Sequence, residues 1–112
     1  MNFYIGNSID EINFQDDNVE FSDELQHFIY KMDMRGQVSI DVSRLCRIDP
    51  YGHVEVSKKD LPQIAEICNY ILGTELLQNY KEPDEGRQML QDLLEITQKA
   101  MSNDSGLVSI GD

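Results

Sequence analysis

Residues 49–72 read DPYGHVEVSKKDLPQIAEICNYIL and carry the signals for a turn, a strand and a helix in direct succession. Asp49 and Pro50 open the stretch and Gly52 follows two residues later, which is the residue preference of a type I turn. Strict alternation over residues 53–56 then predicts a strand whose valines face the core. Because the chain reverses just before it, we expect this strand to pair with the segment that precedes the turn.

The second half of the same stretch predicts a helix. Pro62 suits a first helical turn, where a proline loses no helical hydrogen bond, so we expect the regular helix to begin at Asp60. Apolar residues then recur at helical spacing until Gly73. They are Leu61, Ile64, Ala65, Cys68, Ile71 and Leu72. This stripe predicts that one side of the helix packs against a core.

The remaining C-terminal chain predicts a second long helix and a closing strand. Residues 76–80 either continue the first helix or restart it before Pro83. From Asp84 onward, apolar residues at helical spacing trace an amphipathic helix that ends in the polar cluster of residues 103–106. Residues 107–111 read as a short strand, which we expect to pair in the sheet, because a strand so near a terminus is ordered only when it is held in place.

The N-terminal half contains further strand signals. Residues 2–6 alternate like a first strand. Period-two spacing in residues 12–14 and 19–21, on either side of a short polar stretch, predicts a hairpin. Residues 37–42 alternate apolar with polar side chains and predict another half-buried strand, whereas residues 43–48 fit either an extended chain or one short helical turn.

A helix is expected between these strand signals. Ser22 can cap its N-terminus, and Asp23 and Glu24 place negative charge in the first turn, where the helix dipole favours it. One face is apolar and consists of Leu25, Phe28, Ile29 and Met32. The pattern stops near Gly36.

Together these elements predict a single α+β domain over residues 1–112. We expect a mixed or largely antiparallel sheet of four to five strands, with two long C-terminal helices and one shorter N-terminal helix packed against it. No stretch approaches the ~18 apolar residues of a membrane span, and the N-terminus lacks the pattern of a signal peptide. We therefore expect a cytoplasmic protein in which Cys46 and Cys68 are free thiols, the latter buried.

Sequence patterns of the common catalytic sites are absent from the chain. It contains no phosphate-binding glycine loop, no GxSxG, no HExxH and no paired CxxC. His27 and His53 are the only side chains with an ordinary pKa near neutrality, and both are expected on the solvated surface. We expect no enzyme activity, no cofactor and no metal, and a small enzyme that uses carboxylates is the least favoured hypothesis.

Charge gives the main indication of function. The chain has 21 acidic and nine basic residues, a net charge of −12, and its first basic residue is Lys31. Such a surface repels the phosphates of nucleic acids and anionic membranes, and it favours a basic protein partner. The alternative is that the charge only keeps the protein soluble. Seven acids precede Lys31: Asp10, Glu11, Asp16, Asp17, Glu20, Asp23 and Glu24.

These seven acids and Tyr51 form our predicted partner-binding set. Tyr51 occupies the third position of the turn, where an aromatic ring is often exposed, and tyrosine is frequent among interface anchors. The alternative for Tyr51 is that its ring packs back onto its own sheet.

The turn, the valine strand, the helix SKKDLPQIAEICNYIL and the closing GLVSIGD resemble a group of small bacterial immunity proteins. These are encoded beside polymorphic or contact-dependent toxins, which they block by tight binding. The resemblance covers about residues 48–72 and 106–112. It implies an α+β protein that binds the C-terminal effector domain of a toxin, often a nuclease, in the cytoplasm. A regulatory adaptor with an unrelated partner would fit the same fold and charge.

Overall fold

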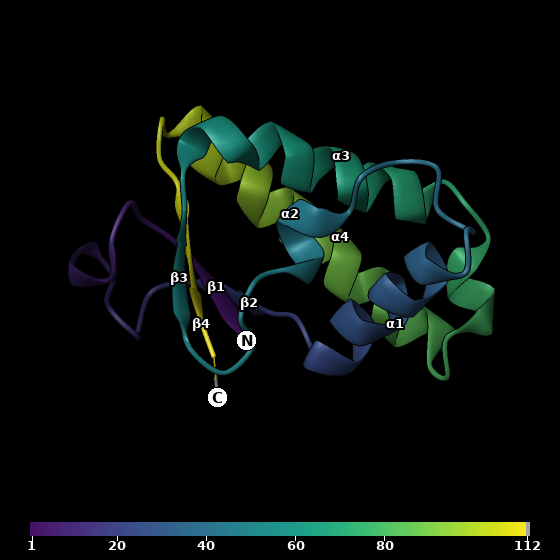
Figure 1. Ribbon diagram of the computed structural model, residues 1–112. Helices are drawn as coiled ribbons and strands as arrows, with labels where there is room; N and C mark the ends of the chain where they lie inside the picture. Colours follow the sequence, from purple (N-terminus) through teal and green to yellow (C-terminus); the bar gives the residue numbers. More distant parts are fainter. Residues whose placement is uncertain (112) are drawn as a thin grey trace.

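The structure, a computed structural model, describes residues 1–111 and contains a four-stranded antiparallel sheet with the α-helices on one of its faces (Figure 1). The strands lie in the order β2-β1-β4-β3. Their bounds are β1 Asn2–Ile5, β2 Asn18–Glu20, β3 His53–Val56 and β4 Leu107–Ile110. The predicted α+β class is confirmed, and the sheet has the lower of the two expected strand numbers.

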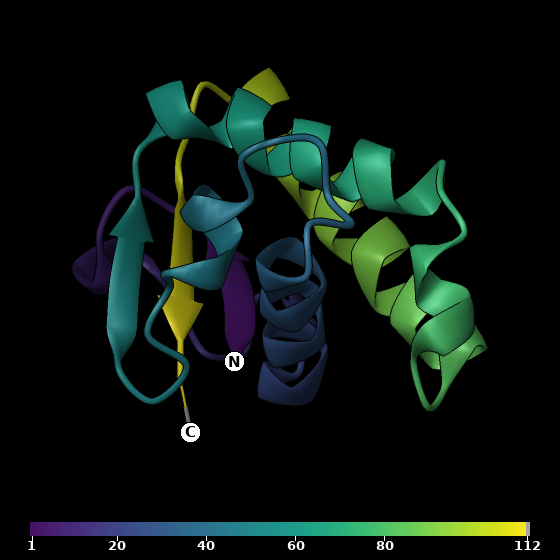
Figure 2. The same cartoon turned by 45° about the vertical axis from the view of Figure 1, so that its right-hand side comes forward.

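Within residues 1–111, four α-helices and three short 3-10 helices accompany the sheet. The α-helices are α1 Asp23–Met34, α2 Ser43–Cys46, α3 Leu61–Leu72 and α4 Pro83–Ser102, and the 3-10 helices are η1 Ile9–Glu11, η2 Lys58–Asp60 and η3 Leu76–Asn79. The longest helix, α4, packs against β1 and β2, and α3 packs along α4 (Figure 2). The predicted ranking of helix lengths is only partly right, because α1 and α3 have 12 residues each. Within residues 1–111, no helix combines the length and the apolar character that crossing a membrane requires.

Helix boundaries follow the capping signals closely. The Ser22 hydroxyl accepts a hydrogen bond from the Leu25 amide at 3.1 Å, so α1 begins where the sequence predicts. Pro62 lies in the first turn of α3, which starts one residue later than expected because Lys58–Asp60 forms a 3-10 turn. Residues 76–80 restart as a 3-10 helix and do not continue α3.

The closing strand lies in the middle of the sheet. β4 pairs with β1 on one side, with Phe3 opposite Ser109, and with β3 on the other, with Val54 opposite Ser109. The prediction that the last strand is paired is therefore confirmed. Pairing of β3 with the preceding segment, which we also expected, is wrong, since the partner of β3 is β4.

Both faces of the sheet are covered, but by different structures. Phe3 and Leu107 are fully buried under the helices, and Phe3 meets Phe21 edge to face at 6.5 Å. Residues 6–17 cross the opposite face, on the far side from the helices (Figure 1). There the Phe14 ring stands edge to face against Tyr4, with ring centroids 6.0 Å apart.

The predicted hairpin between residues 12–14 and 19–21 does not form. β2 pairs with β1 instead, and residues 12–14 belong to the covering segment. Within that segment, side-chain oxygens bind nearby backbone amides: Glu11 accepts from Ser8 at 3.0 Å and Asp16 accepts from Asn13 at 3.1 Å. Such local bonds compete with a strand ladder, which explains why the alternation failed as a strand signal here.

The predicted strand over residues 37–42 is also wrong. These residues form an irregular connection between α1 and α2, and the Ser39 amide donates to the Tyr70 hydroxyl at 3.0 Å. Val38 and Ile40 are half-buried against the helical layer, so the apolar positions were recognised but their partner was not. Residues 43–46 take the helical alternative that the sequence left open.

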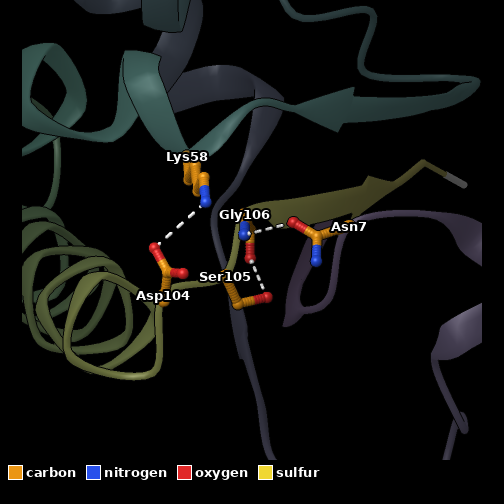
Figure 3. A network of polar contacts seen from close by, with 5 residues as sticks. All are labelled: Asn7, Lys58, Asp104, Ser105 and Gly106. Atoms are coloured by element: carbon orange, nitrogen blue, oxygen red, sulfur yellow. Dashed lines mark hydrogen bonds and ion pairs between the residues drawn. The ribbon is translucent and has the colours of Figure 1, made fainter.

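A polar junction ties the start of β4 to two distant segments (Figure 3). The Gly106 amide donates to the Asn7 side chain at 2.9 Å, and Lys58 forms an ion pair with Asp104 at 3.1 Å. Asp104 adopts a left-handed φ of 53°, which turns the chain out of α4. The segments before η1, at η2 and after α4 therefore meet at one end of the sheet.

Candidate protein-binding groove

A groove of about 480 Å³ lies between α1 and the stretch from Cys46, the last residue of α2, to Tyr51. Asp23, His27 and Tyr30 of α1 line one wall. Cys46, Pro50 and Tyr51 line the other, and Glu24 and Gln26 contribute from α1 as well. We call this feature the α1 groove.

Aromatic rings stand at both walls of the α1 groove. Tyr51 is 71% exposed and Tyr30 is 46% exposed, so both rings present large surfaces to solvent. His27 stacks on Tyr30, with ring centroids 6.3 Å apart and planes inclined by 20°. The Tyr51 hydroxyl donates to Asp23 Oδ2 at 3.4 Å, which connects the two walls. Tyr51 therefore does not pack onto its own sheet, which was one of the two alternatives for it.

The base of the groove is a buried amide that holds the walls together. Gln26 is 5% exposed, and its Nε2 donates to the carbonyl oxygens of Leu45 at 2.9 Å and Ile48 at 2.8 Å. One side chain of α1 thereby satisfies two carbonyls at the end of α2. Because one acceptor belongs to α2 and the other to the loop that follows it, these bonds fix the second wall against the first. The aromatic residues are thus displayed on a supported surface.

Neither cysteine is poised to react. Burial, together with the nearby Asp33 carboxylate, raises the pKa of the Cys46 thiol to about 11. Burial also raises the pKa of the Cys68 thiol to about 12. Both cysteines are free, as the sequence predicts, and near neutral pH they hold their protons, whereas a nucleophilic cysteine needs a lowered pKa.

Asp23 and Glu24 differ in their surroundings. Glu24 forms an ion pair with Lys81, and this hydrogen-bonded carboxylate raises the pKa of the exposed Lys81 ammonium. Asp23 has no ion-pair partner among residues 1–111. Asp23 is therefore a negative charge without an ion pair beside Tyr51, and so, within the described residues, is Asp49, which accepts a hydrogen bond from the Tyr51 amide at 2.9 Å.

The predicted partner-binding set divides into separate regions. Asp23, Glu24 and Tyr51 come together at the α1 groove. Four other acids, Asp10, Glu11, Asp16 and Asp17, lie on or near the segment that covers the opposite face of the sheet (Figure 1). Glu20 lies at the end of the edge strand β2. All seven acids are exposed, but they do not form one continuous face.

Sequence reasoning missed His27, Tyr30 and Gln26 as contributors to the groove. The sequence indicates the exposure of Tyr30 and His27 only weakly. Both lie outside the apolar stripe of α1, so they were expected to face solvent. Nothing in the sequence indicates the role of Gln26, since its acceptors are 19 and 22 residues away in the chain. In the described part of the chain, no three His, Cys, Asp or Glu side chains are grouped so that they could hold a metal ion.

Comparisons of the chain with protein-family models, with curated proteins and with solved structures found no match. The resemblance to immunity proteins therefore remains a prediction from residues 48–72 and 106–112.

Proposed function

We propose that this chain is a binding protein without enzymatic activity, and that the α1 groove binds a basic protein partner. The observation that carries the proposal is Asp23, which has no ion-pair partner among the described residues and accepts a hydrogen bond from the exposed Tyr51. The exposed ring of Tyr30 lines the same groove. Following the sequence resemblance, we propose that the partner is the effector domain of a toxin and that the chain acts as its immunity protein.

The chemistry of the groove suits an arginine or lysine side chain. A cation above a tyrosine face gains about 0.5–1 kcal/mol at an exposed site, and more when it is desolvated. The Asp23 carboxylate offers a charge-assisted hydrogen bond next to the Tyr51 ring. Tyrosine and arginine are also the residue types most enriched at interface hot spots. A basic side chain that enters the groove would contact an aromatic face and the Asp23 carboxylate at the same time.

The overall charge supports the same partner. A net charge of −12 attracts a cationic protein over long distances and raises its association rate, by roughly 10- to 1000-fold in strongly steered cases. A nuclease domain has to bind a polyanion, so it is a protein class with the required positive charge. The acids on the opposite face of the sheet contribute to this long-range attraction without contacting the partner.

The test is binding to the product of the neighbouring gene, measured by surface plasmon resonance and by rescue of growth when that product is expressed. Asp23→Asn combined with Tyr51→Ala is expected to weaken binding at least roughly tenfold, mainly through faster dissociation. The control is Asp10→Asn combined with Asp17→Asn, on the opposite face of the sheet. It removes two negative charges, one more than the groove variant, and it should leave the dissociation rate unchanged. Equal dissociation rates for the two double variants would contradict the groove, and a bound partner that is not toxic would point to an adaptor.

A further inference from the structure

The sheet has an open edge along β3. Among residues 1–111, β3 pairs only with β4 and is therefore an edge strand of the sheet. The segment that covers the opposite face of the sheet reaches β3 through a side chain only, because the Ile9 amide donates to the Glu55 carboxylate at 3.1 Å. His53 and Glu55 are both exposed on this strand. An open strand presents a row of unpaired backbone groups that another chain can join.

Hydrogen-bonded and non-hydrogen-bonded residue pairs alternate between β3 and β4, and this alternation shows which backbone groups of β3 face outward. The Gly111 amide donates to the Gly52 carbonyl at 2.7 Å, so these two residues are a hydrogen-bonded pair of the antiparallel ladder. Such pairs alternate along the ladder, so Val54 and Val56 bond to β4 and the residues between them do not. The N–H and C=O groups of His53 and Glu55 therefore point away from the sheet.

A second groove, of about 240 Å³, runs between β3 and α2, directly beside this edge. Arg44 and Arg47 line it together with Ile48 and Val54, and two acids, Glu55 and Asp60, line it as well. Arg44 is engaged, because its guanidinium lies 3.6 Å from Asp60 and its Nε donates to Gln63 at 3.0 Å.

Arg47 differs from Arg44 in having no ion pair. Among residues 1–111, no carboxylate lies within ion-pair distance of its guanidinium. The Asp41 carboxylate lies close enough that Arg47, after the hydrogen bonds from Ser43, helps to lower its pKa, but it does not pair with Arg47 directly. A cation without an ion pair thus stands next to unpaired backbone donors and acceptors, on a chain that is otherwise strongly acidic.

We propose that the open edge of β3 accepts an extended segment of another protein as a fifth strand, with an acidic side chain beside Arg47. In antiparallel pairing, the two residues opposite His53 and Glu55 would exchange four backbone hydrogen bonds with them. The residue between those two lies opposite Val54, so its side chain projects over the groove that Arg47 lines. This site is independent of the α1 groove and of the function proposed for it.

A second copy of the same chain fits this edge less well. Two β3 strands related by a two-fold axis would place Val54 opposite Val54 and leave Arg47 of each copy without an anion. Two chains of charge −12 also repel each other. The opposite edge, β2, suits an acidic strand poorly, because the hollow beside it is lined by one cation, Lys99, and three acids: Asp17, Asp92 and Glu95.

The probe is the peptide acetyl-TTETT-amide, titrated at millimolar concentration into ¹⁵N-labelled protein and followed by amide chemical shifts. The amides of His53 and Glu55 should shift, and those of Asn18 and Glu20, which face outward on β2, should not. Acetyl-TTKTT-amide and the Arg47→Glu variant should each weaken binding roughly two- to fivefold, as expected for an exposed ion pair. N-methylation of the two threonines that flank the glutamate should abolish the shifts.

A matched pair of protein variants tests the backbone contribution. Glu55→Pro removes an outward amide but keeps the bonds of Val54 and Val56 to β4, so it should block the peptide. Glu55→Ala loses the same carboxylate but retains the amide, and it should still bind. The proposal is overturned if His53 and Glu55 do not shift, if the N-methylated peptide shifts them equally, or if light scattering finds a dimer that Glu55→Pro dissociates and Glu55→Ala does not.

Discussion

Gly106 lies so close to the carbonyl oxygen of Val56 that a β carbon on Gly106 would collide with it. The carbonyl of Gly106 accepts a hydrogen bond from the Gly6 amide at 3.0 Å, and its own amide donates to Asn7. The chain therefore enters the central strand between two neighbours that both approach its backbone. Only glycine leaves room for this approach.

Gly106→Ala should consequently lower the free energy of unfolding by about 2 kcal/mol or more, because either β3 or β4 must move. Gly73→Ala is the control, since Gly73 has an ordinary helical φ of −85° and a β carbon there would meet the Asn69 carbonyl oxygen at 3.2 Å. Urea unfolding monitored by circular dichroism measures both changes. Equal losses in the two variants would show that the close approach at Gly106 is easily relieved.

Gln26→Met should lower the free energy of unfolding by about 1–3 kcal/mol, because it leaves the buried carbonyls of Leu45 and Ile48 without their donor. The second wall of the α1 groove should also become mobile, which faster hydrogen exchange of residues 46–51 would report. Gln63→Met removes an amide of the same type from an exposed position, and its effect should stay below about 0.5 kcal/mol. Similar values for the two variants would contradict the structural role of Gln26.

Two buried hydroxyl groups should respond to removal with opposite signs. Ser109 Oγ has no hydrogen-bond partner among the described residues, so Ser109→Ala should raise the free energy of unfolding by about 1 kcal/mol. Thr97 Oγ1 donates to the Leu93 carbonyl at 2.6 Å, so Thr97→Val should lower it by about 1 kcal/mol. Thermal unfolding compares the two directly, and a loss of stability in Ser109→Ala would mean that its hydroxyl finds a partner in solution.

The Cys68 thiol should make stability depend on alkaline pH. The pKa of Cys68 is about 12 in the folded protein, and its ordinary value of 9.0 applies to the unfolded chain. The stability that the protonated thiol contributes is therefore fully present below pH 9. As the pH rises from 9 towards 12, the unfolded chain loses the proton and the folded chain keeps it, so stability falls. The stability difference between the wild type and Cys68→Ala should therefore shrink between pH 8 and pH 10.5 in urea unfolding. A constant difference would contradict the raised pKa.

Local signals predicted the helices well and the strand pairing poorly. The Ser22 cap, the position of Pro62 and the apolar stripe ending at Gly73 depend on neighbours within a few residues, so the sequence contains them in full. The alternation in residues 37–42 correctly indicates half-burial, but it does not distinguish burial against a sheet from burial against helices. Whether these residues form a strand depends on packing between segments that lie far apart in the chain.

The candidate site was predictable only as separate parts. Asp23 was selected for its charge and Tyr51 for its place in a turn, and nothing in their local sequence indicates that they meet. Their contact spans 28 residues and requires α1 to pack against the loop that follows α2. Arg47 had no pattern of its own, because its significance comes from the open edge beside it.

The central position of β4 has a consequence for biosynthesis. β1 and β3 never touch each other along the ladder, and both depend on a strand that the ribosome adds some fifty residues after the later of them. Until Leu107–Ile110 has emerged from the ribosome, the nascent chain can form its helices, but the edges of β1 and β3 that pair with β4 have no partner. A premature stop codon before residue 107 would remove β4 and leave β1 and β3 without the strand that joins them.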